Sequence, residues 1–390
     1  MADKAYITPK VLKWARESAR ISIIDAAKKI NIKPEKLNSW EEGVEHPTIA
    51  QAQNLAKLYK RSFAIFFLPE PPTDFQPLQD YRRDNFKPLS TASIFMIREV
   101  QQRQAWISEL FAENGEEALS FVGKFSINDS PSIVANDILS LLGINPLAYK
   151  NNNPIKNWID CAEKKGIFIS KSSYIHPKLK LDSDELKGFA ISDKYAPFVF
   201  VNSDDWNAPQ LFTLVHEIAH IWIAQSGISN TTEVDVRMKD NLHPVELFCN
   251  QVAALALIPD VIIKSLTKEN IIDKSTITHV TKKLGISYSV LLVRALNAGL
   301  INYVEYQGLK RKADKDFKAY IQAEELKLAE RKEKKSGGPN FYLLQVGKNS
   351  RLFTQIVLDA YRGGRIEPTQ ASRLLNVKTN NFYKLEAFIK

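Results

Sequence analysis

Cysteine is scarce in this chain, because its 390 residues include only Cys161 and Cys249. Two thiols cannot form a disulfide framework or a four-thiolate metal site, so we expect a reducing, cytoplasmic environment. Long apolar runs are also missing. In the N-terminal third the longest run, 63–68, is far shorter than the roughly 20 residues that span a bilayer. Residues 1–13 carry charges of both signs and no apolar stretch, so we expect neither a secretory signal nor a membrane association.

The composition is that of a folded, soluble protein whose net charge is distributed unevenly along the chain. Hydrophobic residues make up 44% and charged residues 25%, which excludes wholesale disorder. The length corresponds to roughly two to three domains. The net charge is +9, and it is uneven: residues 1–61 carry a net +5, whereas residues 151–265 carry a net −3. The basic ends favour an acidic partner such as nucleic acid, and the mildly acidic middle indicates a separate role.

The first sixty residues read as short helices joined by tight turns. Ser22 is a good N-cap for a helix, residues 31–33 form a turn, and Pro34 suits a first helical position. Trp40 then belongs to a buried face. A short helix, a three-residue turn and a second short helix predict a helix-turn-helix within residues 8–61.

Residues 34–42 would be the recognition helix of this unit. Four positions on or beside it are candidate DNA contacts: Lys33, Lys36, Asn38 and Ser39. The lysines can contact phosphates, and the asparagine or serine can contact a base edge. Three glutamates in the same stretch weaken the local positive field, so binding of another protein stays an open alternative.

The rest of the chain is expected to be mainly helical with a small sheet, giving an α+β fold. Residues 69–89 read as a linker that wraps a surface, since prolines break the chain there. Apolar β-type runs occur at 167–169 and 198–201. We expect the following segments: 1–68 a helix-turn-helix domain, 69–150 a linker and helical connector, 151–265 a domain with a small mixed or antiparallel sheet, 266–335 a helical, helix-turn-helix-like region, and 336–390 a C-terminal helical region.

A weak internal echo links three distant places in the chain. Residues 27–32, 281–286 and 372–377 share the pattern of a helix end followed by a turn. Their spacing is irregular, which excludes a solenoid. The echo therefore indicates either three helix-turn-helix-like units or only three similar helix ends.

The strongest chemical signal is His216-Glu217-Ile218-Ala219-His220. Residues four apart lie on one face of a helix, so both imidazoles can reach the same metal ion. Glu217 lies about 100° around the helix and can address the attacking water rather than the metal. Apolar neighbours on this predicted helix provide a buried scaffold for the site.

A catalytic zinc usually has three protein ligands and an open position. The candidates downstream for the third ligand are Glu233, Asp235, Asp240, His243 and Glu246. Glu246 is favoured because the rest of its predicted helix is mostly apolar, and a bare buried carboxylate is costly. His243 is the alternative ligand, or a hydrogen-bond donor to a developing oxyanion. Asn250, one turn after Glu246, either supports a ligand or makes an ordinary helix contact.

These groups fit zinc-dependent hydrolysis of a peptide bond. One zinc ion per chain would polarise the carbonyl and activate water, and manganese would also suit nitrogen and oxygen ligands. Glu217 would accept the proton of the water and return it to the leaving amine. The β-type runs that precede the histidine helix could offer an exposed edge that holds an extended peptide by strand addition.

Taken together, these motifs resemble the ImmA/IrrE family of metallo-endopeptidases, in the form with an N-terminal Xre-type helix-turn-helix. The N-terminal resemblance rests on residues 12–20, 26–29, 40–43, 47–48 and 66–69, and the peptidase resemblance on 198–202, 212–220, Glu246, 249–250, 253–254 and 257–259. The resemblance implies that residues 151–265 form a zincin-like peptidase domain. It also implies that His216, His220 and Glu246 bind the metal and that Glu217 is the catalytic base.

The resemblance also implies a biological setting. Relatives cleave repressors or antitoxin-like regulators encoded nearby, in stress responses, mobile elements or toxin–antitoxin-like operons. We therefore expect a cytoplasmic zinc endopeptidase that acts on a protein regulator and is coupled to a DNA- or partner-binding domain. The alternative is a transcription regulator or antitoxin component without protease activity.

Overall fold

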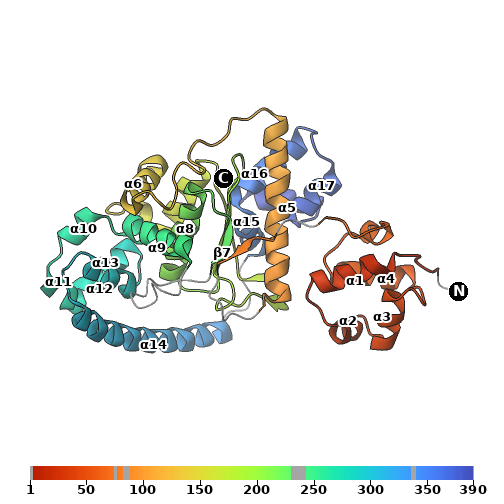
Figure 1. Ribbon diagram of the computed structural model, residues 1–390, viewed down its shortest axis with the longest axis horizontal. Helices are drawn as coiled ribbons and strands as arrows, with labels where there is room; N and C mark the ends of the chain where they lie inside the picture. Colours follow the sequence, from red (N-terminus) through yellow and green to blue (C-terminus); the bar gives the residue numbers. More distant parts are fainter. Residues whose placement is uncertain (1–2, 74–76, 82–87, 230–242, 335–339, 390) are drawn as a thin grey trace. The chain divides into compact units, whose positions relative to one another are not determined.

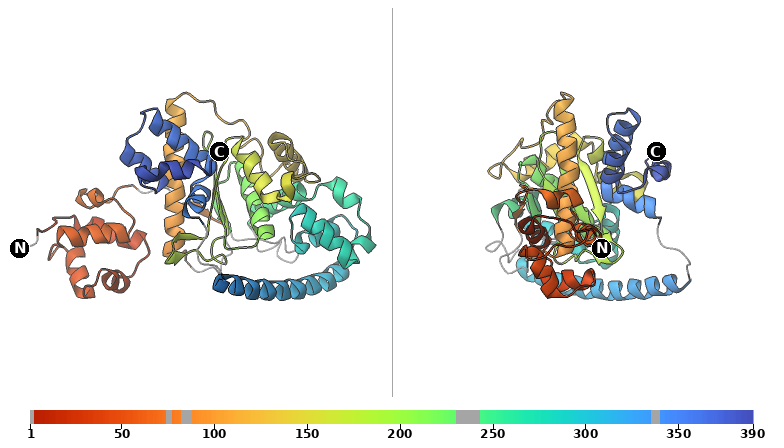
Figure 2. Two further views of the ribbon diagram at one scale, coloured as in Figure 1. Left: turned by 180° about the vertical axis from the view of Figure 1, so that it is seen from behind. Right: turned by 90° about the vertical axis from the view of Figure 1, so that its right-hand side faces the viewer.

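The computed structural model describes residues 3–73, 77–81, 88–229, 243–334 and 340–389, and it is mainly helical (Figures 1 and 2). Contacts divide it into two compact units. The first contains residues 1–77, 87–101 and 174–180, and the second contains 78–86, 102–173 and 181–390. Among the described residues, no helix combines the length and the apolar character needed to cross a bilayer.

The first unit is built around a helix-turn-helix. Its helices in chain order are α1 (Pro9–Ser18), α2 (Ile23–Lys29), α3 (Pro34–Glu41), α4 (Ile49–Leu58) and the 3-10 helix η1 (Phe63–Phe67). Ser22 caps α2 as predicted, because its side chain accepts a hydrogen bond from the backbone N–H of Asp25. Leu37 and Trp40 on α3 are buried, in agreement with the predicted inner face.

A buried ion pair joins α1 to α3. The Arg16 guanidinium donates two hydrogen bonds to the Glu41 carboxylate, each 2.8 Å long. The Arg16 and Glu41 side chains are 12% and 3% exposed, so water screens the pair weakly. This bidentate contact fixes the orientation of α3 relative to α1.

The internal echo corresponds to three copies of one helix cap. Asn31, Gly285 and Asn376 occupy the same position of the three segments and all adopt left-handed backbone conformations, with φ of 58°, 72° and 53°. The apolar residue that follows each of them donates its N–H to the carbonyl five positions earlier. This bonding is the Schellman ending of a helix, so the shared sequence reports a common helix end. A further helical turn or helix follows each cap, as the helix-turn-helix-like reading requires.

The second unit contains a five-stranded mixed sheet in the order β1-β7-β5-β6-β2. Its strands are β1 (Gln79–Asp80), β2 (Phe168–Ser172), β5 (Gly188–Ile191), β6 (Phe198–Asn202) and β7 (Gly227–Ser229). Strand β5 runs antiparallel to both β6 and β7, whereas β2 is parallel to β6 and β1 is parallel to β7. A separate two-stranded hairpin is formed by β3 (Tyr174–His176) and β4 (Leu179–Lys180).

Helices cover both faces of this sheet. The helices up to residue 257 are α5 (Thr91–Glu113), which begins in the first unit, α6 (Pro131–Leu142), α7 (Pro154–Glu163), α8 (Asn207–Trp222) and α9 (Pro244–Leu257), with the 3-10 helix η2 (Lys150–Asn152). Helix α8 packs on β5 and β6, and α9 packs on α8 and α6. The apolar run of β6 is therefore buried throughout, because Val199 and Val201 join the α8 side while Phe198 faces the other side.

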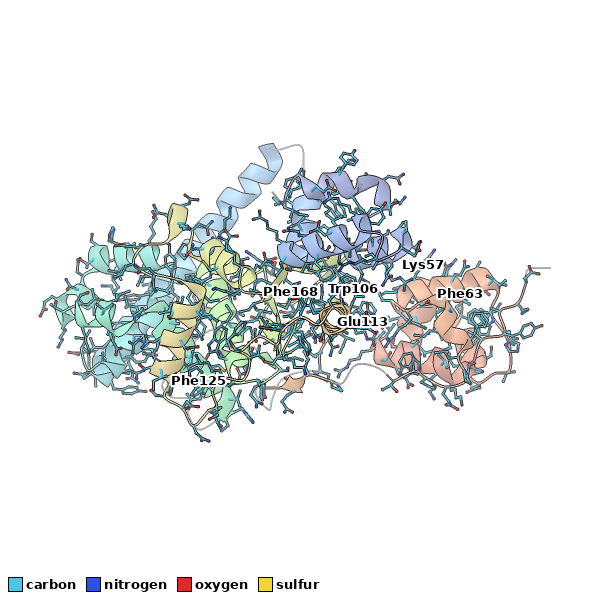
Figure 3. The ribbon with its side chains drawn as sticks, turned by 90° about the horizontal axis from the view of Figure 1, so that it is seen from above. Lys57, Phe63, Trp106, Glu113, Phe125 and Phe168 are labelled. Carbon is cyan, nitrogen blue, oxygen red and sulfur yellow. The ribbon has the colours of Figure 1, made fainter. Side chains whose placement is uncertain are left out.

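The opposite face is filled by aromatic rings. Phe168 and Phe198 stack on neighbouring strands with ring centres 4.6 Å apart, and Phe353 contacts Phe198 at 6.2 Å. Trp106 on α5 contacts the same Phe353 at 6.0 Å, and Figure 3 labels Trp106 and Phe168 within this layer. The sheet is thus held between α8 on one side and an aromatic layer on the other.

The remaining helices of the second unit come later in the chain than α9. They are α10 (Asp260–Lys264), α11 (Lys268–Ile272), α12 (Lys274–Leu284), α13 (Tyr288–Asn297), the long α14 (Tyr303–Lys334), α15 (Phe341–Asn349), α16 (Arg351–Arg362), α17 (Pro368–Leu375), the 3-10 helix η4 (Thr379–Asn381) and α18 (Phe382–Glu386). The helical C-terminal region expected from the sequence is confirmed over the described positions.

The strand order ends with β2 on one side and β1 on the other. Helix α15 packs against β2, where Ser170 donates a hydrogen bond to the carbonyl of Lys348. At the other edge β1 pairs with β7, so residues 79–80 of the expected linker lie along the sheet. The expected exposed edge in the β-runs before the histidine helix is wrong, because β6 is interior and β2 lies under α15.

Candidate metal centre

Helix α8 carries the two histidines into the interior. Every residue from Gln210 to Trp222 is buried, so the helix is fixed on all sides. His216 and His220 are 1% and 0% exposed, and their rings stand one turn apart with centres 4.9 Å from each other. Because the neighbouring residues are apolar and closely packed, the imidazoles have little freedom to turn away.

Helix α9 brings in the carboxylate. Pro244 occupies its first turn, and His243 precedes it as the N-cap, with Nδ1 accepting a hydrogen bond from the backbone N–H of Val245 at 3.3 Å. Glu246 follows in the first turn, where the helix dipole favours a negative charge. Its side chain is 0% exposed and points toward α8.

The three side chains meet at one point. His216 Nε2 lies 3.1 Å from His220 Nε2, and the Glu246 oxygens lie 3.3 Å and 3.0 Å from the two nitrogens. In tetrahedral zinc sites, zinc–nitrogen bonds of 2.0–2.1 Å put neighbouring ligand atoms about 3.3 Å apart. The observed spacing therefore matches a set of atoms that shares one cation.

The charges at this point also suit a cation. Neither oxygen of Glu246 accepts a well-formed hydrogen bond from the described residues. Burial would raise the pKa of Glu246, but the adjacent His216 and His220 outweigh it and lower that pKa to about 2. A buried, ionised carboxylate without hydrogen-bond donors requires a positive partner, so the residues fit a divalent metal ion.

The two histidines differ in their proton affinity. Burial lowers the pKa of His220, which keeps this imidazole neutral, the form that binds a metal. Burial also acts on His216, but the Glu246 carboxylate beside it raises the pKa of His216 above its ordinary value. The form of an imidazole that binds a metal is neutral, so metal binding is expected to release any proton held by His216.

Glu217 lies next to the triad in its own buried pocket. It is 0% exposed, and Ser229 on β7 donates a hydrogen bond to its Oε1. Burial raises the pKa of Glu217 to about 8, although His216 and the Ser229 hydroxyl act in the opposite direction. Gly188 on β5 leaves room for this carboxylate, because a Cβ there would stand 3.0 Å from Glu217 Oε1 and 2.6 Å from Thr213 Cγ2.

The other sequence candidates are placed differently. His243 caps α9 and lies outside the triad of described residues that can share a metal. Asn250 is fully buried one turn after Glu246, and its amide beside His216 contributes to the raised pKa of that imidazole. The remaining third-ligand candidates, Glu233, Asp235 and Asp240, lie outside the described residues.

Tyr81 was missed by sequence reasoning. Its ring stacks against His220, with centres 5.6 Å apart and planes at 22°, and it contacts His243 at 4.8 Å. The Tyr81 hydroxyl donates a hydrogen bond of 3.2 Å to Gln225. No local pattern marks a single tyrosine about 140 positions before its partner, and only the expectation of a linker that wraps a surface pointed in this direction.

The candidate DNA contacts lie on and beside α3. Lys33 and Lys36 are exposed, as a role at phosphates requires. Asn38 donates a hydrogen bond to Glu42 at 2.7 Å, and Ser39 donates one to the carbonyl of Lys36 at 2.9 Å. The two polar side chains are therefore engaged within the helix, whereas the two lysines extend from it.

Two comparisons agree with these observations. Residues 162–296 match the family model of the IrrE N-terminal-like domain, peptidase M78, and residues 12–66 match a helix-turn-helix family model. No curated protein matches the chain. The matched ranges contain α8, the Glu246 turn of α9 and helix α3.

The central part of the chain is thus a domain of the metallopeptidase class. More narrowly, it is a domain of the IrrE N-terminal-like type, joined to an N-terminal helix-turn-helix domain. The resemblance to the ImmA/IrrE family with an Xre-type domain is confirmed, and so is the mainly helical α+β fold with a small mixed sheet.

Proposed function

We propose that the protein is a cytoplasmic, zinc-dependent endopeptidase that cleaves a protein regulator and is coupled to a DNA- or partner-binding domain. The observation that carries the proposal is the convergence of His216, His220 and Glu246 within 4.8 Å of one another, with Glu217 beside them. The family match and the fit of this buried donor set to a divalent cation support it.

The residues have distinct roles in this proposal. His216, His220 and Glu246 hold the cation, which supplies Lewis acidity and activation of water when bound. Glu217 accepts the proton of the attacking water and delivers it to the leaving amine. Ser229 fixes the Glu217 carboxylate through its hydrogen bond.

The substrate we propose is a repressor or antitoxin-like regulator. Support comes from the architecture, because a peptidase domain and a helix-turn-helix domain in one chain suit a protease that acts in gene regulation. A chain that recognises DNA or a DNA-bound protein is placed close to such a target.

Chelation tests this function. Zinc-loaded protein, incubated with each regulator encoded beside its gene, is expected to cut one of them at a defined bond, as read by intact-mass spectrometry. Cleavage should stop when 1,10-phenanthroline removes the metal and return when zinc is restored, because the cation supplies part of the chemistry. Cleavage that continues unchanged in the metal-free protein would contradict the proposal.

DNA binding through α3 leads to a second expected result. The double substitution Lys33→Ala and Lys36→Ala should weaken binding to DNA and reduce the slope of log affinity against log salt by about 2, since two phosphate contacts are lost. Fluorescence anisotropy over a salt series measures both quantities. The charge-matched control Lys13→Ala with Lys57→Ala, also exposed, should keep the wild-type slope. Absence of DNA binding by the wild type at low salt would favour a protein partner instead.

A further inference from the structure

The edge of the sheet beside the metal centre is occupied by the chain itself. Gln79 and Asp80 of β1 pair in parallel with Gly227 and Ile228 of β7, and the backbone N–H of Tyr81 donates a 3.1 Å hydrogen bond to the carbonyl of Ile228. These contacts satisfy the main-chain groups that an added strand would use.

The same segment also covers the metal centre. The Tyr81 side chain is 7% exposed and packs over His220 and His243, and its hydroxyl is bonded to Gln225. A residue that lies across a proposed metal ligand occupies space that a substrate side chain needs when its peptide bond approaches that metal.

Strand β7 is the strand with which an extended substrate would pair. Its last residue, Ser229, holds the Glu217 carboxylate, so a peptide paired with β7 passes within reach of the catalytic groups. The opposite edge strand, β2, lies against α15 and offers no comparable place among the described residues.

The contact between the segment and β7 depends on a glycine. A Cβ at Gly227 would stand 2.1 Å and 2.3 Å from Cε2 and Cδ2 of the Tyr81 ring, so the ring rests directly on the backbone of β7. The backbone of Gly227 does not require a positive φ, and an alanine there would act on Tyr81 by collision rather than by strain.

We propose that residues 78–81 act as a built-in occupant of the substrate edge, which a substrate strand must displace before cleavage. This inference rests on the proposed peptidase function and adds its regulation. The pairing spans only two residues, so a longer substrate strand can replace it with more main-chain hydrogen bonds. The segment precedes α5 and follows the helix-turn-helix domain in the chain, which makes it the covalent route by which events in that domain reach the site.

Two variants test the inference in the full-length, zinc-loaded protein. Tyr81→Ala removes the ring, and Gly227→Ala displaces it without changing the segment. The probe is a tetrapeptide hydroxamate, whose dissociation constant is measured by calorimetry. If the segment occupies the edge more than about nine-tenths of the time, both variants should bind the probe about tenfold more tightly or better. Hydrogen exchange at residues 78–81 should accelerate in both.

Matched substitutions elsewhere serve as controls. Tyr383→Ala removes an exposed ring and Gly308→Ala adds a Cβ into open space, so both should keep the wild-type affinity. Unchanged or weaker probe binding in both test variants, with residues 78–81 exchanging freely, would overturn the inference. So would free exchange of this segment in the wild type. If the probe binds as expected but no regulator is ever cut, the peptidase function fails while the occupancy of the edge stands.

Discussion

Replacement of Glu217 by glutamine is expected to lower the rate of regulator cleavage by a factor of about 10²–10⁴ while metal binding persists. Glutamine has the same shape as glutamate and can still accept the hydrogen bond from Ser229, so the local packing should survive. It cannot accept a proton, and proton transfer is the step assigned to this side chain. Single-turnover cleavage assays and metal analysis of the same preparation measure the two effects.

The same variant should also change the pH dependence of stability. In the metal-free protein the pKa of Glu217 is raised from 4.5 to about 8, so the folded state holds this proton more tightly than the unfolded state does. The resulting stabilisation is complete below pH 4.5 and is lost as the pH rises through about 8. Glu217→Gln should lack this part of the dependence in thermal unfolding.

A surface glutamate provides the control for this experiment. Glu117→Gln makes the same chemical change at an exposed position, and wild-type cleavage is expected. Full activity of Glu217→Gln would refute the proposed role of Glu217. Absence of cleavage by the wild type as well, with metal bound, would favour the alternative of a regulator without protease activity.

Metal content should fall most strongly when one of the three residues of the triad is replaced. The wild type is expected to contain about one zinc per chain, and His216→Ala or Glu246→Gln to contain almost none, because each removes one of three buried ligands. Added zinc should raise the melting temperature of the wild type but not of these variants, since only a folded state that binds the ion gains stability. Inductively coupled plasma mass spectrometry and thermal scans provide the readouts.

A substitution of His243 tests the alternative in which this histidine, rather than Glu246, is the third metal ligand. Because it caps α9 and lies outside the triad, His243→Ala should retain its zinc and lose only a modest amount of stability. Loss of zinc in His243→Ala, with His216→Ala still loaded, would require a different ligand set. Little metal in the wild type after zinc has been added and the excess removed would contradict the metallopeptidase proposal itself.

The local part of this site was predictable from the sequence. His216 and His220 are four positions apart on a helix, and helical geometry alone places them on one face. Glu246 was favoured among several candidates because its predicted helix is mostly apolar, with His243 as the alternative, and the family resemblance implied the same residue. In the structure Pro244 starts α9, which puts His243 at the N-cap and Glu246 inside the first turn. The two candidate ligands are therefore neighbours along the chain, but only Glu246 faces the histidines.

The non-local part was not predictable in the same way. Strand order depends on pairings between distant segments, and the apolar runs at β2 and β6 carry no sign of which one forms an edge. Tyr81 contacts His220 only because β1 joins β7, a pairing of two residues that no periodicity reveals. The pattern shared by the three helix ends is the opposite situation, because a repeat that is visible in the sequence arises from a local helix cap and from no long-range contact.

The pairing of β1 with β7 has a consequence for self-association. An uncovered strand edge presents unpaired N–H and C=O groups that recruit another chain, and proteins commonly avoid this by covering such edges. Helix α15 packs against the β2 side, whereas the β7 side is paired with a short segment of linker. A molecule whose linker has left β7 therefore has an unpaired strand edge until another strand pairs with β7. Molecules in this open condition should aggregate at high concentration, and a tightly bound client peptide should keep them monomeric.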